Sequence, residues 1–598
     1  MKSARNYILH ILVLIVLIIF AFLTNAHKIW DIQQIVFYND TQFWREHIAI
    51  IGGPSEWLTN LICQFFYFPI IGNFLLGVLL FILFEIFLLV VNKISNSNYN
   101  FIISFIIPAL FIYMLKNPIF PLNFIFQLII SFILVYLFLR FYSLKIYIDS
   151  ILFSLFFIAL FYTSSFLSAL IFSLSVILYD LNQHKGKIWY RLANIILLST
   201  IVYLIAKYVM FLPNDRFLIG KELFTFQTIR LTRVLFIFFA VMLLLIVAFL
   251  LHKKLRTASP APLILNAGIG IVIFIGSWLI PLNDENILPD TFRYFDHTKK
   301  WDKILSKAQK LHSNDRIVNY YTNKALYYTG KLSTNLFDYP QSWGEYALFL
   351  TTLTEPNTLM DNSNIFYELG HIGAARYWAF EAQTVFENRP EILKRLAECN
   401  IILENYQAAK PFALKLSKSI VHRTIANYYL RLINDTTLIA QDKVIVHKRK
   451  CTPKVSVFIT KQNPENELKM LIETNPKNRM AYEYLQTYYL LHNDVIKFVK
   501  NICNMSNIGF NFLPNIYEEG IITYYYMINQ KTDTLCGYTI SDASKYRFEG
   551  YKRALSQFGG NFESAEPFLK ETFGTTYWFY LHFVSPITLK KEITIEHE

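Results

Sequence analysis

Long apolar stretches separated by short polar segments dominate the first half of the chain. Two of them, residues 234–251 and 263–280, flank the basic cluster His252-Lys253-Lys254-Leu255-Arg256. Each approaches the roughly 18–20 residues that a helix needs to cross the hydrocarbon core of a bilayer, and basic loops between spans stay in the cytoplasm. The pattern therefore predicts two transmembrane helices joined on the cytoplasmic side, with everything after Pro281 outside the cytoplasm.

Seven more apolar stretches precede this pair and bring the predicted number of spans to nine. They lie at residues 7–23, 71–91, 101–115, 120–139, 146–162, 166–179 and 192–212. An odd number of spans puts the N-terminus in the cytoplasm and the C-terminus outside it. The first stretch precedes small residues that suit signal-peptide cleavage, Thr24-Asn25-Ala26, but its length favours a retained helix.

Few ionisable residues interrupt the apolar stretches. Asp149 and Asp180 lie at the ends of predicted spans, where they need no function, whereas Glu85 and Lys207 lie deeper. A charge at the centre of a bilayer helix costs about 3 kcal/mol on insertion scales, so such residues face the bundle interior or pair with each other. A pairing of Glu85 with Lys207 across the bundle would be a feature of a transporter.

After residue 300 the pattern changes to amphipathic helices joined by modest loops. The offsets from Phe366 to Leu369, Gly370, Ala382 and Phe386 match the tetratricopeptide pattern, which has an aromatic residue, Leu-Gly, and small and aromatic positions on a second helix. In that pattern Gly370 and Ala382 allow two helices to approach closely, and the two phenylalanines fill the space around them. The sequence therefore predicts a tetratricopeptide-like region, clearest over residues 301–419.

The segment 436–464 departs from the helical pattern. It is polar and contains two β-branched runs, Val444-Ile445-Val446 and Val455-Ser456-Val457-Phe458-Ile459. Such runs favour extended strands. We expect an insertion or a loop at this place.

Composition supports the membrane assignment and excludes several functions. The 598 residues are 54% hydrophobic, with a mean hydropathy of +0.34, which is too apolar for a wholly soluble protein. The net charge of +13 has its cause in the basic residues between spans, and without a long basic run interleaved with aromatics nucleic-acid binding is not expected. The five cysteines form no CxxC and no pair at metal-ligand spacing, so neither a metal nor another cofactor is predicted.

Disulfide formation stays open at this point. Cys451, Cys503 and Cys536 would be able to form a disulfide in an oxidising compartment. Buried free thiols are the favoured interpretation.

Three short stretches carry a resemblance that covers the whole chain. They are Gly52-Gly53-Pro54-Ser55-Glu56-Trp57-Leu58, Gln64-Phe65-Phe66-Tyr67-Phe68-Pro69 and Asn475-Pro476-Lys477-Asn478-Arg479-Met480-Ala481. The chain resembles an uncharacterised family of bacterial multi-pass membrane proteins with a helical-repeat C-terminal region. The resemblance implies an architecture rather than an activity.

These observations predict an all-α protein: a polytopic transmembrane helical bundle followed by a soluble helical-repeat (tetratricopeptide-like) domain. The bundle occupies residues 1–281, with an outer loop at 26–61, and the repeat domain occupies residues 282–598. The expected location is a bacterial inner membrane, with the N-terminus in the cytoplasm and the repeat domain in the periplasm. The expected partners are membrane lipids and a protein that docks on the repeats.

Two classes of function remain open. In the first, the protein is a membrane-anchored platform that binds its partner through the repeats. In the second, it is an enzyme, because a first span, an acidic outer loop, many further spans and an outer helical domain resemble the C-type membrane glycosyltransferases that act on a lipid-linked sugar. That resemblance implies an acidic residue in the first outer loop that acts as a base or a metal ligand.

The candidate catalytic residues of the enzyme hypothesis are Asp31, Asp40, Glu46 and Glu56. Arg216 or Lys221 would neutralise a lipid phosphate. The outer loop lacks the adjacent acidic pair that such enzymes often show, and solvated carboxylates are common in loops. The platform is therefore the preferred hypothesis, and the sequence does not decide whether the protein is an enzyme.

Overall fold

In the computed structural model the helices form two compact units. Unit 1 comprises Met1–Ile287 and Lys418–Arg423, and unit 2 comprises Leu288–Ser417 and Thr424–Glu598. The structure describes residues 2–25, 36–95, 97, 99–116, 120–142, 146–183, 188–220, 231–255, 263–279, 287–353, 355–386, 388–454, 464–559 and 561–587. These residues are helical apart from loops and one short hairpin, so the predicted all-α class is confirmed.

Unit 1 is a bundle of long apolar helices with short helices between them. Its elements are α1 (Lys2–Asn25), α2 (Thr41–Ile48), α3 (Gly53–Cys63), the 3₁₀ turn η2 (Gln64–Tyr67), α4 (Pro69–Ile94), α5 (Asn100–Met114), α6 (Asn123–Arg140), α7 (Ile146–Thr163), α8 (Phe166–Asn182), α9 (Ile188–Leu204), the π-helical turn η3 (Ile205–Val209), α10 (Asn214–Ile219), α11 (Leu231–Leu255) and α12 (Leu263–Leu279).

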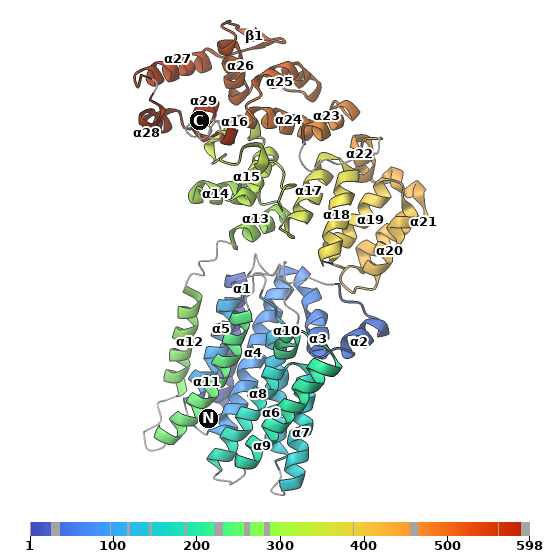
Figure 1. Cartoon of the computed structure of the whole chain (residues 1–598), viewed down its shortest axis with the longest axis vertical. Helices are drawn as coiled ribbons and strands as arrows, with labels where there is room; N and C mark the ends of the chain where they lie inside the picture. The colour runs from blue at the N-terminus through green and yellow to red at the C-terminus, as the bar shows by residue number, and fades with distance from the viewer. Residues whose placement is uncertain are drawn as a thin grey trace. The chain divides into compact units, whose positions relative to one another are not determined.

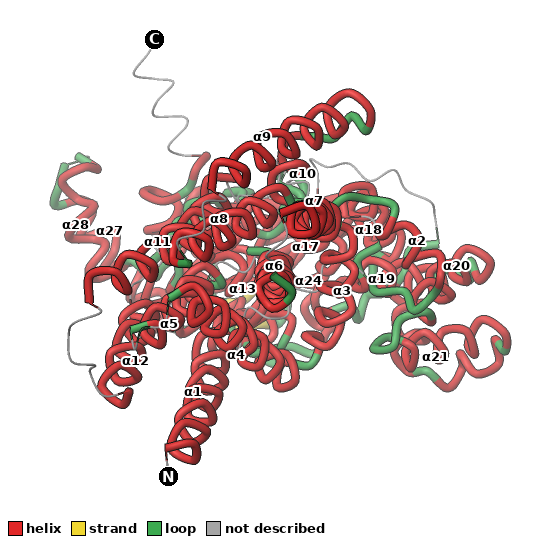
Figure 2. Tube along the Cα trace, turned by 90° about the horizontal axis from the view of Figure 1, so that it is seen from below, coloured by secondary structure: helices red, strands yellow, loops and turns green. Residues whose placement is uncertain are grey.

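Helix α6 lies at the centre of unit 1. It packs against α3, α4, α7 and α8, and Figure 2 shows it nearly end-on among them. Its side chains Phe124, Leu128 and Phe132 are fully buried. Helix α1 packs on α4 at Gly77, where a Cβ would lie 2.7 Å from the Cα of Ile18, so this glycine allows the two helices to approach closely.

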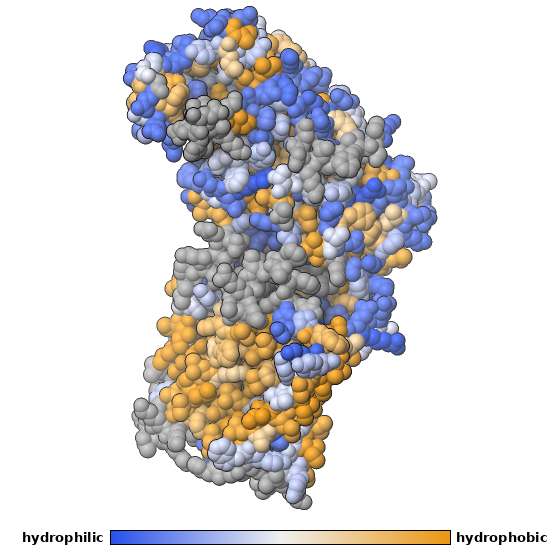
Figure 3. All heavy atoms as spheres, in the orientation of Figure 1, coloured by the Kyte–Doolittle hydropathy of each residue, from blue (hydrophilic) through white to orange (hydrophobic). Residues whose placement is uncertain are grey.

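Four helices are long and apolar enough to cross a membrane, judged by length and composition alone: Pro69–Ile94, Asn123–Arg140, Ile188–Val209 and Val234–Leu251. Shorter apolar helices lie at the other five predicted spans: Tyr7–Leu23, Asn100–Met114, Tyr147–Thr163, Phe166–Asn182 and Gly268–Ser277. In Figure 3 the visible face of unit 1 is mainly hydrophobic, which is unusual for a helix bundle in water. All nine predicted stretches are thus helical, and their passage through a membrane stays a prediction.

Unit 2 is built from shorter amphipathic helices and one hairpin of strands. Its elements are α13 (Ile287–His297), α14 (Trp301–Leu311), α15 (Arg316–Tyr328), α16 (Leu332–Asn335), η4 (Leu336–Asp338), η5 (Gly344–Ala347), α17 (Thr358–Leu369), α18 (Ile372–Phe386), α19 (Pro390–Ile402), α20 (Tyr406–Ser417), α21 (Arg423–Asn434), η6 (Thr436–Gln441), α22 (Lys443–Cys451), α23 (Pro464–Thr474), α24 (Arg479–Leu491), α25 (Val495–Asn501), η7 (Ile502–Ile508), α26 (Asn515–Met527), β1 (Thr534–Leu535), β2 (Tyr538–Thr539), α27 (Asp542–Ser556), α28 (Phe562–Phe573), α29 (Tyr577–Phe579) and the π-helical turn η8 (Tyr580–Val584).

Consecutive helices of unit 2 pack as pairs. Helix α14 packs on α15, α17 on α18, α19 on α20 and α23 on α24, and Figure 1 shows α17 to α20 side by side. Polar side chains fix where several helices begin. Asp315, Asn478 and Ser541 each accept a hydrogen bond from the backbone N–H three residues later, which satisfies one of the free donors of the first turn.

A disulfide links two separate loops of unit 2. Strands β1 and β2 pair antiparallel, with Cys536 in the turn between them, and Cys536 bonds to Cys503 in η7 with a Cα–Cα distance of 5.3 Å. Of the two alternatives left open for these cysteines, the disulfide is the correct one for Cys503 and Cys536, and the favoured free-thiol interpretation is wrong for this pair. Cys399 and Cys451 are buried thiols outside any disulfide, and Cys63 is buried in unit 1.

Two buried cations hold the first helices of unit 2 together. Lys324 of α15 is 1% exposed, and its Nζ lies 2.8 Å from both Asp296 of α13 and Glu368 of α17. Burial alone would lower the pKa of Lys324, but the two carboxylates outweigh burial and raise that pKa above its usual value. Arg293 of α13 donates to both carboxylate oxygens of Asp361 in α17, at 3.0 and 2.8 Å.

A buried carboxyl group in α26 makes the stability of unit 2 depend on pH. Glu519 is 2% exposed and accepts a hydrogen bond from the Tyr577 N–H at 2.7 Å. Burial raises the pKa of Glu519 from 4.5 to about 7. Between these two values the folded chain holds a proton that the unfolded chain has lost, so stability falls as the pH rises, by on the order of 3 kcal/mol in total. Glu519→Gln keeps the acceptor and should stabilise unit 2 at pH 8 but not at pH 5.

Thermal melts of the full chain in mild detergent at pH 5 and pH 8 check this prediction. Glu563→Gln is the matched control, because Glu563 is an exposed carboxylate on α28. We expect a higher melting temperature for Glu519→Gln at pH 8 and no difference for the control at either pH. A shift of equal size at both pH values would contradict the titration of Glu519.

Candidate functional site

A tight turn joins α2 to α3 in unit 1. Gly52 has a left-handed φ of 78°, and its N–H donates to the carbonyl oxygen of Tyr162 at 2.9 Å. A Cβ on Gly53 would lie 1.8 Å from the carbonyl oxygen of His47. Pro54 follows in the first turn of α3, where its fixed φ suits a helix start. The backbone thus needs glycine at positions 52 and 53, and it accepts proline at position 54. This explains the sequence Gly-Gly-Pro at the start of the stretch 52–58.

The backbones of three turns meet at Gly52. A Cβ on Gly52 would lie 2.2 Å from the carbonyl oxygen of Gly220, which ends α10 with a φ of 68°. A Cβ on Gly220 would lie 1.8 Å from the carbonyl oxygen of Ser164, in the turn between α7 and α8. No side chain fits at either glycine. We call the contact of Gly52, Gly220 and Ser164 the glycine junction.

Buried polar side chains tie the glycine junction to the central helix α6. The Nε2 of Gln127 donates to the carbonyl oxygen of Ile219 at 2.7 Å, and the hydroxyl of Ser165 donates to Oε1 of Gln127 at 3.3 Å. Nearby, the hydroxyl of Thr59 in α3 donates to Asn123 of α6 at 3.2 Å. Hydrogen bonds in such apolar surroundings are strong, so these contacts fix the three turns on the bundle.

Glu56 of α3 and Arg216 of α10 lie beside the glycine junction. The Nη2 of Arg216 is 3.9 Å from Oε2 of Glu56, and its Nη1 donates to the carbonyl oxygen of Ile51 at 3.3 Å. The side chain of Glu56 is 16% exposed and that of Arg216 is 12% exposed. A carboxylate can accept a proton and a guanidinium can bind a phosphate group, so this pair joins a predicted base to a predicted phosphate ligand.

The other predicted residues of the enzyme hypothesis belong elsewhere. Asp40 caps α2, where its Oδ1 accepts a hydrogen bond from the Phe43 N–H at 2.8 Å. Glu46 is exposed on the same helix and accepts a hydrogen bond from Gln42 at 2.9 Å. Asp31 and Lys221 lie outside the described residues.

The tetratricopeptide-like residues lie at packing positions of α17 and α18, with one exception. Phe366, Leu369 and Ala382 are at most 2% exposed, and Phe386 is partly buried against a small cluster that contains Ala382. Gly370 lies outside both helices, because it ends α17 with a φ of 92°. A Cβ on Gly370 would lie 2.5 Å from the Cβ of Cys451. The predicted role of Gly370 between paired helices is therefore wrong, since it makes room for α22.

The chain matches the model of one protein family along nearly its whole length. The model of a family described as "Family of unknown function (DUF6057)" matches residues 2–584. The chain belongs to this family. The match runs through both units. No curated protein and no solved structure matches the chain.

Sequence analysis missed a buried charge cluster in unit 1. Arg191 of α9 is fully buried, hydrogen-bonded to Asp149 of α7 and, through Nε at 3.0 Å, to Asp180 of α8. The hydroxyl of Tyr142 donates to Asp180 at 2.6 Å. The sequence-based prediction gave the two aspartates no role and did not single out Arg191. The signal that points to the cluster is the spacing, because one charge sits at an end of each of three consecutive apolar stretches.

The predicted pairing of Glu85 with Lys207 is wrong. Glu85 of α4 forms a hydrogen bond and ion pair with Nδ1 of His10 on α1. Lys207 is exposed and donates to the hydroxyl of Tyr203 at 3.3 Å. The argument for a transporter therefore loses its support. Within the described ranges, no group of three or more His, Cys, Asp and Glu side chains is arranged to hold a metal ion.

Proposed function

We propose that this protein is an integral membrane protein whose unit 2 is a platform for a protein partner outside the cytoplasm. The observation that carries this proposal is an exposed apolar turn where α26 ends. Tyr526, Met527 and Ile528 are 55%, 62% and 41% exposed. Tyrosine and methionine are enriched at protein interfaces, and a run of three large apolar side chains in contact with water suits burial by a second protein.

The packing of unit 2 supports the platform. Its paired helices and the buried Phe366, Leu369 and Ala382 agree with a tetratricopeptide-like stack, in which each pair leaves one face free for binding. The apolar turn is also held in place on one side, because the Tyr526 ring contacts Phe548 of α27 at 5.3 Å and Lys552 lies 5.1 Å from its centre. A fixed aromatic side chain loses little conformational freedom on binding.

The disulfide supports the proposed location of unit 2 outside the cytoplasm. Bonds such as Cys503–Cys536 persist in oxidising compartments, of which the periplasm is one, and are rare in the cytoplasm. With nine spans, a C-terminal unit outside the cytoplasm implies an N-terminus in the cytoplasm. The inner membrane of a bacterium is the location that combines these features.

Site-specific photo-crosslinking in the native cells tests the platform. A photo-reactive residue at Met527 should give one crosslinked protein of defined mass, whereas the same residue at the exposed Lys570 of α28 should not. The partner is then purified and its affinity measured for the full chain. We expect at least a tenfold loss of affinity in the triple variant Tyr526→Ser, Met527→Asp and Ile528→Ser. Equal crosslinking at both positions, or equal affinity of both chains, would reject the platform.

The Glu56–Arg216 pair favours a second function, the transfer of a sugar from a lipid-linked donor. In this reaction Glu56 would take the proton from an acceptor hydroxyl as its oxygen attacks the anomeric carbon. The bond from that carbon to the lipid phosphate breaks, and Arg216 would neutralise the charge of the departing phosphate. The two groups lie 3.9 Å apart in unit 1, so both belong to the same place in the bundle.

Mass spectrometry of the purified protein tests this second function. The wild-type chain should retain a polyprenyl-linked sugar in mild detergent, and Arg216→Gln should lose it. Glu56→Gln should retain the lipid but no longer transfer the sugar, while Glu46→Gln, at the exposed position on α2, should behave as wild type. Recovery of bulk phospholipid alone from the wild type would reject the transferase and leave the platform standing.

A further inference from the structure

A basic pocket lies on unit 2 between α13 and α14, far in sequence from the apolar turn. It encloses about 330 Å³ and is lined by Phe295 of α13 and by Asp302, Lys303, Ser306, Lys307 and Lys310 of α14. The lysines follow a spacing of four and three residues, which places all three on one face of a helix. We call this site the lysine pocket.

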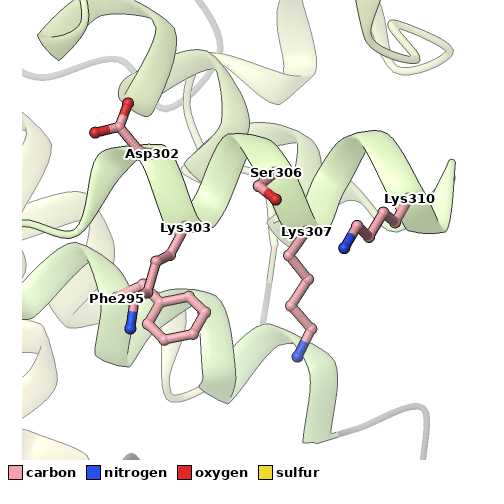
Figure 4. Close-up of a pocket in the computed structure, with 6 residues that line it drawn as sticks. All are labelled: Phe295, Asp302, Lys303, Ser306, Lys307 and Lys310. Atoms are coloured by element: carbon pink, nitrogen blue, oxygen red, sulfur yellow. The ribbon is translucent and has the colours of Figure 1, made fainter.

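The lysine side chains leave α14 on the side that faces α13. In Figure 4 Lys303, Lys307 and Lys310 extend from that side, with Lys303 beside the Phe295 ring. Asp302, the acidic residue of the lining, points away from the lysine tips in the same view. The three ammonium groups thus lie along the side of α14 that faces α13, and the lining also contains the Ser306 hydroxyl and the Phe295 ring.

The positive charge of the lysine pocket is not compensated within the described part of the chain. None of Lys303, Lys307 and Lys310 forms an ion pair with a described residue, in contrast to Lys324 on the neighbouring helix α15. Lys303 and Lys310 are exposed, but Lys307 is half-buried. Burial lowers the pKa of Lys307, so its charged form has no stabilising anion among the described residues.

We propose that the lysine pocket binds a phosphate group, carried either by the headgroup of an anionic phospholipid or by a soluble phosphate compound. Lysine binds phosphate as a point charge, and several ammonium groups together match an anion that bears up to two charges. The volume is at the lower end of the range for small-molecule sites, which leaves room for the phosphate and for part of the group that carries it. Phe295 offers an apolar contact to that group.

The position of the pocket along the chain makes both sources reasonable. Helix α13 begins eight residues after α12 ends, and α12 is the last predicted span. Lysine side chains near a membrane surface attract the anionic headgroups of phospholipids. The pocket also faces solvent, where a soluble phosphate compound has access.

Binding to the full chain in mild detergent tests the proposal with two probes. Inorganic phosphate is titrated and followed by calorimetry, and phosphatidylglycerol is titrated against zwitterionic phosphatidylcholine and followed by native mass spectrometry. The variant Lys303→Gln, Lys307→Gln and Lys310→Gln removes the three charges. The matched control removes three exposed lysines of unit 2 that are not gathered in a pocket, with Lys477→Gln, Lys531→Gln and Lys570→Gln.

We expect at least a tenfold loss of affinity in the pocket variant and less than a twofold change in the control. A loss seen with inorganic phosphate assigns a soluble compound, and a loss seen with phosphatidylglycerol alone assigns a lipid headgroup. The proposal is overturned when both probes bind the pocket variant as they bind wild type, or when neither probe binds wild type. The charge-conserving variant Lys303→Arg, Lys307→Arg and Lys310→Arg should retain binding, which separates lost charge from lost structure.

Discussion

Replacing Arg191 by methionine should destabilise unit 1 by about 3–5 kcal/mol, because the change leaves two buried carboxylates without their cation. Arg191 and Asp180 are fully buried, and Asp149 is 1% exposed. The guanidinium also lies 4.8 Å from the centre of the Phe153 ring, within cation–π distance, and methionine would lose that contact. The measurement is the melting temperature in detergent, together with the fraction of the protein that elutes as a single species.

Variants of the same cluster separate lost pairing from lost packing. Arg140→Met is the matched control, because Arg140 is exposed at the end of α6 and its loss should leave the melting temperature unchanged. The triple variant Arg191→Met, Asp149→Asn and Asp180→Asn removes all three charges and should recover much of the lost stability. Arg191→Lys should not, since a single ammonium cannot reproduce the fork that reaches both carboxylates. A stable Arg191→Met chain would show that the carboxylates are neutral or paired otherwise.

Lys324→Met should have an effect of similar size in unit 2, about 3–5 kcal/mol. Its ammonium group is the shared partner of Asp296 and Glu368, which come from α13 and α17. Burial raises the pKa of Asp296 to about 6 even in the presence of Lys324, so the site is poor in water. Without the lysine, two carboxylates face each other in the core, and α13 should separate from α15 and α17.

Limited proteolysis and thermal melts of the full chain measure this second effect. We expect cleavage near α13 at a protease concentration that leaves wild type intact. Lys331→Met, at an exposed position just after α15, is the control and should be cleaved like wild type. Adding Asp296→Asn and Glu368→Gln to Lys324→Met should restore resistance. Resistance of the single variant would mean that packing alone holds α13.

Hydrophobic pattern predicted the helices of unit 1 because long apolar runs leave the backbone few alternatives. The predicted stretch 71–91 lies within α4 (Pro69–Ile94), and 146–162 lies within α7 (Ile146–Thr163). Local propensity was a weaker guide in unit 2. Val444-Ile445-Val446 reads as a strand but lies in α22, because the side chain of Asp442 caps the helix with hydrogen bonds to the Val444 and Ile445 N–H groups. The second β-branched run, residues 455–459, lies outside the described residues.

Pairings between distant residues were much harder to predict than helices. The sequence proposed Glu56 and Arg216 separately for one site, but nothing in a single chain shows that α3 and α10 meet. The suggested pairing of Glu85 with Lys207 was wrong, because the sequence does not show that α1 packs on α4 and brings His10 to Glu85. The Cys503–Cys536 bond likewise depends on the hairpin of β1 and β2. Its strands have only two residues each, which is too short for a recognisable sequence pattern. Three-dimensional contact decides such pairs, and sequence periodicity does not encode it.

The glycine junction also sets an order of assembly for unit 1. Gly52 belongs to the turn before α3, and the ribosome makes its neighbour Gly220 only after α4 to α10 have been synthesised. The turn before α3 therefore lacks its contact with Gly220 until the later helices have joined the bundle. The closing step comes late and joins backbone to backbone, with no flexible side chain to absorb an error. Alanine at position 220 should block this contact, and the bundle would then stay incomplete and open to proteolysis.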